Sequence, residues 1–171
     1  MATKSPPIIR PVSWIGIVVQ VGFICLLATI VAFAFGVREA ALALLIAAAA
    51  QSVFARVMRL SLTSEHRRGI ALLRQRKFSE AAPLFEASYA SLARHPWIDR
   101  LRFVLLGSAS SMSYREMALC NAAFAYSQLG DGARAIQLYE QTLREFPDSS
   151  LATSSLQMLR AGQSLATPRE T

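Results

Sequence analysis

An uninterrupted apolar segment near the start of the chain decides the fold, and residues 14–36 read WIGIVVQVGFICLLATIVAFAFG. As a helix it would rise about 34 Å at about 1.5 Å per residue, enough to cross a hydrocarbon core of about 30 Å. Gln20 is its one strongly polar side chain, and Trp14 stands where an interfacial aromatic anchor is expected. Soluble domains distribute their apolar residues periodically, so this segment predicts a transmembrane helix.

A second, weaker apolar segment follows, and residues 40–58 read AALALLIAAAAQSVFARVM. Alanine contributes little transfer free energy, and polar residues such as Gln51 and Arg56 disfavour insertion near the centre of a span. Arg56 and Arg59 stand at the end of the segment, however, where long side chains can reach the lipid headgroups. The segment therefore qualifies as a second span.

Together the two segments predict a transmembrane helical hairpin over residues 13–58, with helices at about 13–36 and 39–58, after an N-terminal cytoplasmic tail of residues 1–12. The alanine-rich face of the second helix suits close packing against the first helix, where Gly16 and Gly22 leave room. Close contact between small residues is what holds helices together in lipid.

Basic residues on one side of the hairpin predict its orientation. Lys4 and Arg10 precede the first span, and an arginine-rich stretch over residues 56–77 follows the second. The turn between the spans carries Arg38, offset by Glu39. Because positive residues are retained in the cytoplasm, we predict an integral membrane protein with two spans and both termini cytoplasmic.

Two other interpretations of the apolar leader stay open. Ala32-Phe33-Ala34 resembles the cleavage site of a signal peptide, although the apolar run exceeds the usual length of about 7–15 residues and a second block follows it. Residues 40–58 could also form an amphipathic helix on the membrane surface, which would place the C-terminal part of the chain on the opposite side.

Residues 116–149 have the pattern of two antiparallel helices joined by a tight turn. Small residues stand where the helices would cross, and aromatic residues stand where neighbouring pairs would meet. The positions are Ala123 and Tyr126 in the first helix, Gly130 in the turn, Ala135 and Tyr139 in the second helix, and Pro147 at its end. This pattern resembles a tetratricopeptide repeat, a helix–turn–helix unit.

A weaker copy of the pattern covers residues 62–95, with Gly69 and Ala81 at the crossing positions and Phe85 at the second-helix aromatic position. We also predict an extra helix at 97–106, a final helix at 149–160 and a flexible C-terminal tail over 161–171. The predicted fold is therefore all-α: a two-helix transmembrane hairpin followed by a short tetratricopeptide-like stack over residues 62–160.

The resemblance implies a groove for an extended peptide or a partner helix on the inner face of the first helices. Carried over by register, the groove residues are His66, Arg67, Ile70 and Arg74 from the first copy, and Met117, Asn121, Phe124 and Gln128 from the second. Such a basic and partly apolar groove favours an acidic-hydrophobic peptide. Packing of Met117 and Phe124 against residues 97–106 is the alternative.

The sequence gives little support for catalysis, metal binding or nucleic-acid binding. The two histidines have no cysteine or carboxylate at metal-ligand spacing, and no glycine-rich phosphate loop or nucleophile elbow occurs. We therefore predict a protein that is not an enzyme and needs no cofactor or metal. The net charge of +7 includes no basic motif interleaved with aromatics, which disfavours nucleic-acid binding.

The predicted function is that of a membrane-anchored adaptor or scaffold that binds a protein partner and assists the assembly or stability of a membrane complex. The alternative is a structural small subunit of a larger membrane complex. Repeat stacks usually need three or more units to bury a continuous core. A shorter stack leaves apolar surface for a partner, for a second copy of the chain in a homo-oligomer, or for the lipid bilayer.

Overall fold

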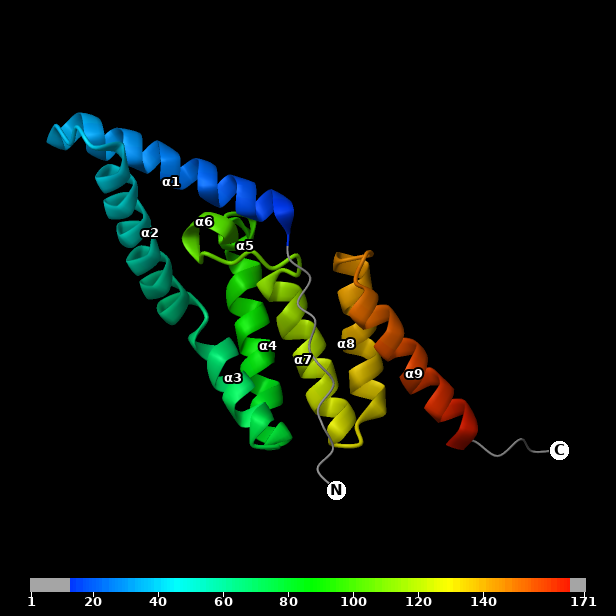
Figure 1. The fold of residues 1–171 in the computed structure, drawn as a ribbon. Helices are drawn as coiled ribbons and strands as arrows, with labels where there is room; N and C mark the ends of the chain where they lie inside the picture. Colours follow the sequence, from blue (N-terminus) through cyan, green and yellow to red (C-terminus); the bar gives the residue numbers. More distant parts are fainter. Residues whose placement is uncertain (1–12, 167–171) are drawn as a thin grey trace, which may run out of the picture. The chain divides into compact units, whose positions relative to one another are not determined.

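The computed structural model describes residues 13–166, and every regular element in that range is a helix (Figure 1). The predicted N-terminal tail at 1–12, with Lys4 and Arg10, lies outside the described residues. The all-α fold class is confirmed for the described part of the chain. This part divides into two compact units. The hairpin unit comprises the chain up to Ser61 together with Arg100–Met112, and the C-terminal unit comprises Leu62–Asp99 together with the chain from Ser113.

The hairpin unit contains two long helices, α1 (Trp14–Phe35) and α2 (Ala40–Leu62). The Ser13 hydroxyl caps α1 by accepting the amide hydrogen of Gly16, at 3.1 Å. Gly36 ends α1 with φ of 63°, a left-handed conformation that glycine adopts readily. Both helices are long and apolar enough to cross a membrane, and most of their side chains are not buried within the protein.

Small residues join α1 to α2 next to the turn. Ala28 of α1 and Ala43 and Ala47 of α2 are buried there, with larger apolar side chains packed around them. The prediction that Gly16 and Gly22 give room for α2 is wrong. A Cβ atom on Gly22 would have no neighbour within 4 Å, and one on Gly16 would collide with the ring of Phe103.

The segment after α4 does not form the predicted single helix at 97–106. It forms two short helices, α5 (Pro96–Arg100) and α6 (Arg102–Leu105), followed by irregular chain to Met112. Residues from Arg100 onward group with the hairpin unit, where α6 lies against α1, and Figure 1 shows α6 between α1 and α2. The sequence pattern predicts this segment within the C-terminal stack, and the structure differs.

A hydrogen bond between Asp99 and Tyr114 closes the base of the excursion of residues 100–112. The Asp99 carboxylate accepts the amide hydrogen of Tyr114, at 2.9 Å, and Asp99 is buried. The chain therefore leaves the C-terminal unit and re-enters it at neighbouring points. Such a closed loop can be inserted between two helix pairs without separating them.

The C-terminal unit is a succession of antiparallel helices, which are α3 (Ser64–Arg74), α4 (Phe78–Arg94), α7 (Tyr114–Gln128), α8 (Gly132–Glu145) and α9 (Ser150–Ala166). Each packs against the next: α3 on α4, α4 on α7, α7 on α8 and α8 on α9 (Figure 1). The last helix runs to Ala166, beyond the predicted end at 160, so the predicted tail at 161–171 is helical over its first residues.

The ends of α7 and α8 follow from local side-chain chemistry. The Ser113 hydroxyl accepts the amide hydrogen of Glu116, at 3.0 Å, and the Asp131 carboxylate accepts that of Arg134, at 2.9 Å. Gly130 turns the chain between the two helices with φ of 80°. These contacts explain why the boundary between α7 and α8 lies at residues 129–131.

Small residues occupy the crossing points of the helices. Gly69 of α3 meets the ring of Phe85 of α4, where an added Cβ would lie 2.9 Å from a ring carbon. The remaining predicted packing residues differ in their exposure to solvent. Ala81, Ala123, Ala135 and Tyr139 are buried, Tyr126 is half-buried, and Gly130 and Pro147 are exposed in the chain between helices. Burial raises the pKa of the Tyr139 hydroxyl above its ordinary value.

One polar cluster joins three helices of the C-terminal unit. The Glu145 carboxylate of α8 accepts hydrogen bonds from the Tyr89 hydroxyl of α4 and from the Arg115 guanidinium of α7. Partial burial, followed by the bond to Glu145, raises the pKa of Tyr89, so this phenol stays protonated at neutral pH. The cluster fixes the rotation of α8 relative to α4 and α7.

Candidate functional site

The predicted partner groove lies on α3 and α7, and its residues differ widely in exposure. Arg67, Arg74, Phe124 and Gln128 are exposed, whereas Ile70, Met117 and Asn121 are half-buried. These side chains come from the first helices of the two helix pairs, as the register implies. The structure describes them in one compact unit.

His66 is not a surface residue of this groove. Its side chain is only 6% exposed, and its ring lies edge-on to the rings of Phe85, at 5.4 Å, and Tyr114, at 5.7 Å. The assignment of His66 to the groove is therefore wrong. Helical register placed it on the inner face, but two aromatic neighbours from α4 and α7 cover it.

Phe124 is not buried in the core of the C-terminal unit. It is 40% exposed, and its ring lies edge-on to that of Phe78, with centroids 6.2 Å apart. Phe78 begins α4, the second helix of its pair, so this contact joins α4 to α7, the first helix of the next pair. The resulting aromatic pair leaves part of the Phe124 ring available to a ligand.

The exposed surface of α3 and of the turn after it carries several positively charged side chains. Arg67, Arg68 and Arg74 are exposed on the helix itself, and Arg76 and Lys77 follow in the turn. Lys77 lies 3.8 Å from Glu80 in an exposed pair, which water screens strongly. A unit that exposes both a basic helix surface and part of an aromatic ring can bind a segment that combines acidic and apolar residues.

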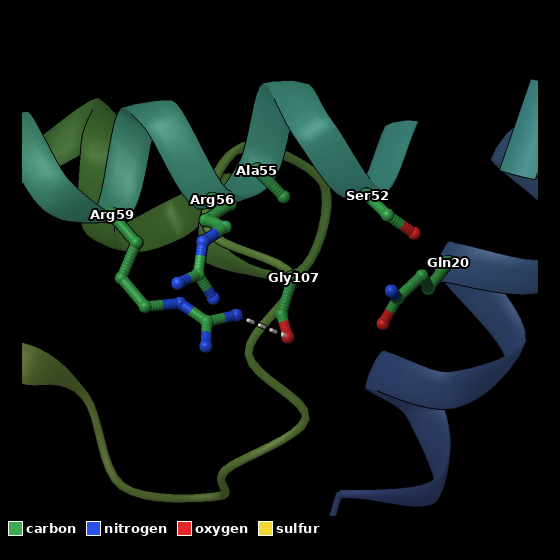
Figure 2. Close-up of a pocket in the computed structure, with 6 residues that line it drawn as sticks. All are labelled: Gln20, Ser52, Ala55, Arg56, Arg59 and Gly107. Carbon is green, nitrogen blue, oxygen red and sulfur yellow. Dashed lines mark hydrogen bonds between the residues drawn. The ribbon is translucent and has the colours of Figure 1, made fainter. Parts of the chain in front are cut away.

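The hairpin unit holds a second feature, a cavity of about 330 Å³. Figure 2 shows its lining, which consists of Gln20 from α1, Ser52, Ala55, Arg56 and Arg59 from α2, and Gly107 from the loop after α6. The polar side chains of two otherwise apolar helices gather here. Arg59 and Gly107 are joined by a hydrogen bond.

The polar residues of α2 bind the backbone of the 100–112 segment. Gln51 Nε2 donates to the carbonyl oxygen of Val104, at 2.6 Å, and Arg59 Nε donates to that of Leu106, at 3.0 Å. Arg59 Nη2 also donates to the carbonyl of Gly107, at 3.1 Å. These donors satisfy carbonyl groups that end a short helix, which matters most where water is scarce.

Sequence patterns alone predict other roles for Gln51 and Arg59. Gln51 disfavours a span, and Arg59 is expected to reach the lipid headgroups. In the structure both side chains instead donate hydrogen bonds to backbone carbonyls between Val104 and Gly107. A signal was present, because Gln51, Ala55 and Arg59 are spaced by four and share one helix face. The backbone that they bind is remote in sequence, so the spacing did not identify the partner.

Comparison with protein families, with curated proteins and with solved structures finds no match. Across residues 13–166, no group of three or more His, Cys, Asp and Glu side chains is placed to hold a metal ion. Both cysteines are free thiols, with Cys25 exposed on α1 and Cys120 buried in α7. Burial, followed by the nearby Glu116 carboxylate, raises the pKa of Cys120 to about 12.

Proposed function

We propose that the chain is a membrane-anchored adaptor whose C-terminal unit binds a protein partner. The helix pairs α3–α4 and α7–α8, followed by α9, support a tetratricopeptide-like stack, because glycine and alanine occupy their crossing points. In this proposal α1 and α2 cross the membrane and both termini are cytoplasmic. The adaptor has no catalytic step and needs no cofactor.

The observation that carries this proposal is the set of exposed basic and aromatic side chains on α3 and α7. It combines the guanidinium groups of Arg67 and Arg74 with the half-exposed ring of Phe124. The matching partner is an extended segment or a helix with acidic residues beside apolar ones. Aromatic and arginine side chains are the types that most often dominate the energetics of protein interfaces.

Anchoring in the bilayer strengthens the binding of a second membrane-bound protein. A tethered site meets its partner at a high effective concentration, so a modest affinity of the groove suffices. This favours a role in the assembly or stability of a membrane complex.

The last helix favours a second candidate function, that of a structural subunit in a larger membrane complex. Leu151 and Met158 of α9 are exposed, and Met158 is 76% exposed. These side chains leave an apolar surface at the open end of the stack, suited to a second copy or to a permanent neighbour. Native gels after mild detergent extraction separate the two functions, because a permanent subunit migrates in one constant large assembly.

Peptide binding tests the groove directly. We expect the full chain in detergent to bind extended peptides that alternate glutamate with leucine, and to bind lysine–leucine peptides at least about fivefold more weakly. Phe124→Ser and Arg74→Ala should each weaken the glutamate–leucine peptide by about fivefold to tenfold, which is roughly 1 kcal/mol. Fluorescence anisotropy measures both effects.

Arg144→Ala is the matched control, because Arg144 is an exposed cation on α8, outside the predicted groove. Its peptide affinity should equal that of the unmodified chain. Equal binding of the acidic and basic peptides, or equal losses in Arg144→Ala and Arg74→Ala, would show that these side chains of α3 and α7 are not the binding site.

A further inference from the structure

Trp97 is the one tryptophan of the C-terminal unit, and it is exposed. Its side chain, in the short helix α5, is 52% exposed, whereas that of the next residue, Ile98, is only 5% exposed. The short helix therefore packs through Ile98 and leaves the indole uncovered by the protein. A single exposed apolar side chain is ordinary in a folded protein, so the residues around Trp97 decide whether it has a role.

The exposed charges next to Trp97 in sequence are positive. Arg94 and Arg100 stand three residues to either side, and both are exposed. The one carboxylate in residues 91–101 belongs to Asp99, which is buried. An exposed indole between exposed basic residues is typical of the boundary between acyl chains and lipid headgroups, where tryptophan is enriched and anionic lipids attract arginine.

The chain that follows Trp97 contacts the start of α1. Within the hairpin unit, the Ser13 amide donates to the Ala109 carbonyl, at 2.8 Å, and the ring of Phe103 lies directly against Gly16. Both contacts lie at the first turn of the helix, which Ser13 caps. The 22 residues of α1 rise about 33 Å, so in the proposed hairpin this first turn lies close to the headgroups.

A short length of chain joins Trp97 to this segment. Six residues separate it from Phe103, and most of them are helical, so the path is well below the roughly 20 Å of an extended chain. Leu101, on this path, is 49% exposed. Chain length alone therefore keeps Trp97 within reach of the headgroup region.

We propose that Trp97 enters the headgroup region of an anionic bilayer surface, with Arg94 and Arg100 contacting lipid phosphates. The indole suits this position, because its ring is apolar and its N–H can donate to a polar headgroup. This inference rests on the proposed anchoring of α1 and α2, and adds a peripheral contact with lipid from the C-terminal unit. The contact restricts the motion of that unit and raises the effective concentration of its groove for membrane-bound partners.

Tryptophan fluorescence of the full chain in vesicles tests this contact, because the chain has two tryptophans. Trp14→Phe leaves Trp97 as the reporter, and Trp97→Phe leaves Trp14 at the start of α1. The vesicles combine phosphatidylglycerol with phosphatidylcholine that carries bromine at a shallow or a deep acyl position. We expect shallow bromine to quench Trp97 at least about twofold more than deep bromine, because interfacial groups enter only the outer part of the bilayer.

Acrylamide, a neutral quencher dissolved in the water, measures the exposure of the same indole. We expect it to quench Trp97 in vesicles at least about threefold less than in the urea-unfolded chain, because headgroups cover the indole. Arg94→Gln should raise this quenching by about twofold, since it removes a cation that anionic lipid attracts. Arg144→Gln, the same charge change at an exposed position of α8, is the matched control and should leave it unchanged. Equal effects of the two substitutions would overturn the assignment of Arg94 to lipid.

Met158→Trp, made in a chain that also carries Trp14→Phe and Trp97→Phe, gives a second reference. Met158 is 76% exposed in the same unit, so its replacement should be quenched by acrylamide and not by bromine. Circular dichroism on each sample shows that the variants keep their helices. Equal bromine quenching at positions 97 and 158 would contradict a specific contact at Trp97.

The two natural tryptophans separate failure of this contact from failure of the anchor. Bromine quenching of Trp14, together with free access of acrylamide to Trp97, would show that α1 is in lipid and Trp97 in water, which overturns this inference alone. Protection of Trp97 from both quenchers would mean that protein covers it, which also overturns the lipid contact. Absence of bromine quenching at Trp14 contradicts the anchoring itself, and this inference with it.

Discussion

Gly69→Trp is expected to unfold the α3–α4 pair, whereas the same substitution at Gly162 should leave the C-terminal unit folded. A Cβ atom on Gly69 would lie 2.9 Å from a ring carbon of Phe85, and Phe85 is fully buried. His66 packs edge-on against this ring, which leaves the ring little room to move aside. Excess volume in a packed core costs about 1–3 kcal/mol for a few methylenes, and an indole adds far more.

Limited proteolysis and thermal unfolding by circular dichroism measure this effect. We expect Gly69→Trp to expose residues 62–99 to protease and to remove the cooperative transition of the C-terminal unit, since single domains have only about 5–15 kcal/mol of stability. Gly162 lies in α9, where an added Cβ would meet nothing within 4 Å. Similar transitions for the two variants would mean that the α3–α4 crossing is misplaced.

Arg59→Met is expected to release residues 101–112 from α2. The substitution keeps most of the aliphatic stem but removes the donors to the Leu106 and Gly107 carbonyls. Leu106 is buried, and a buried carbonyl that loses its donor costs about 1–3 kcal/mol, whereas water can replace the donor at the more exposed Gly107 carbonyl. Because the exchange rate follows the opening free energy, amide hydrogen exchange in this segment should rise by at least about tenfold.

Arg56→Met is the matched control for this experiment. It makes the same substitution one turn earlier, on a side chain for which the structure shows no hydrogen bond to the 101–112 segment. Exchange in that segment should remain as in the unmodified chain. If both variants accelerate exchange equally, net charge and not the Arg59 hydrogen bonds holds the segment.

Much of the fold is predictable from local patterns. Hydropathy and length place α1 and α2, because lipid-compatible helices need a continuous apolar run. The end of α2 was less predictable, and the helix continues to Leu62, beyond the predicted 58. The break between α7 and α8 follows from Gly130 and the Asp131 cap, both of which act within one turn of helix.

The parts that were not predictable depend on contacts between distant residues. The apolar spacing at 97–106 matches one helix, but donors from Gln51 and Arg59 hold the chain in a bent path around Gly107. His66 has the register of a groove residue, and only the packed positions of Phe85 and Tyr114 show that it is buried. Periodicity indicates which face a residue is on, not what covers that face.

The central claim is that α1 lies in the bilayer, and the two cysteines provide a direct measurement. Cys25 is exposed on α1, so only lipid would shield it, whereas Cys120 is buried within the C-terminal unit. Burial also raises the pKa of the Cys120 thiol to about 12, which leaves little of the reactive thiolate at neutral pH. The two thiols are thus protected by different means and should respond to different treatments.

Labelling open membrane fragments with a water-soluble maleimide separates these two kinds of protection, and Cys25→Ala and Cys120→Ala assign the signals. We predict that neither cysteine reacts in the native membrane, that urea exposes Cys120 alone, and that detergent with urea exposes both. Reaction of Cys25 in intact membrane fragments, or a mature chain that lacks Cys25, would contradict the account.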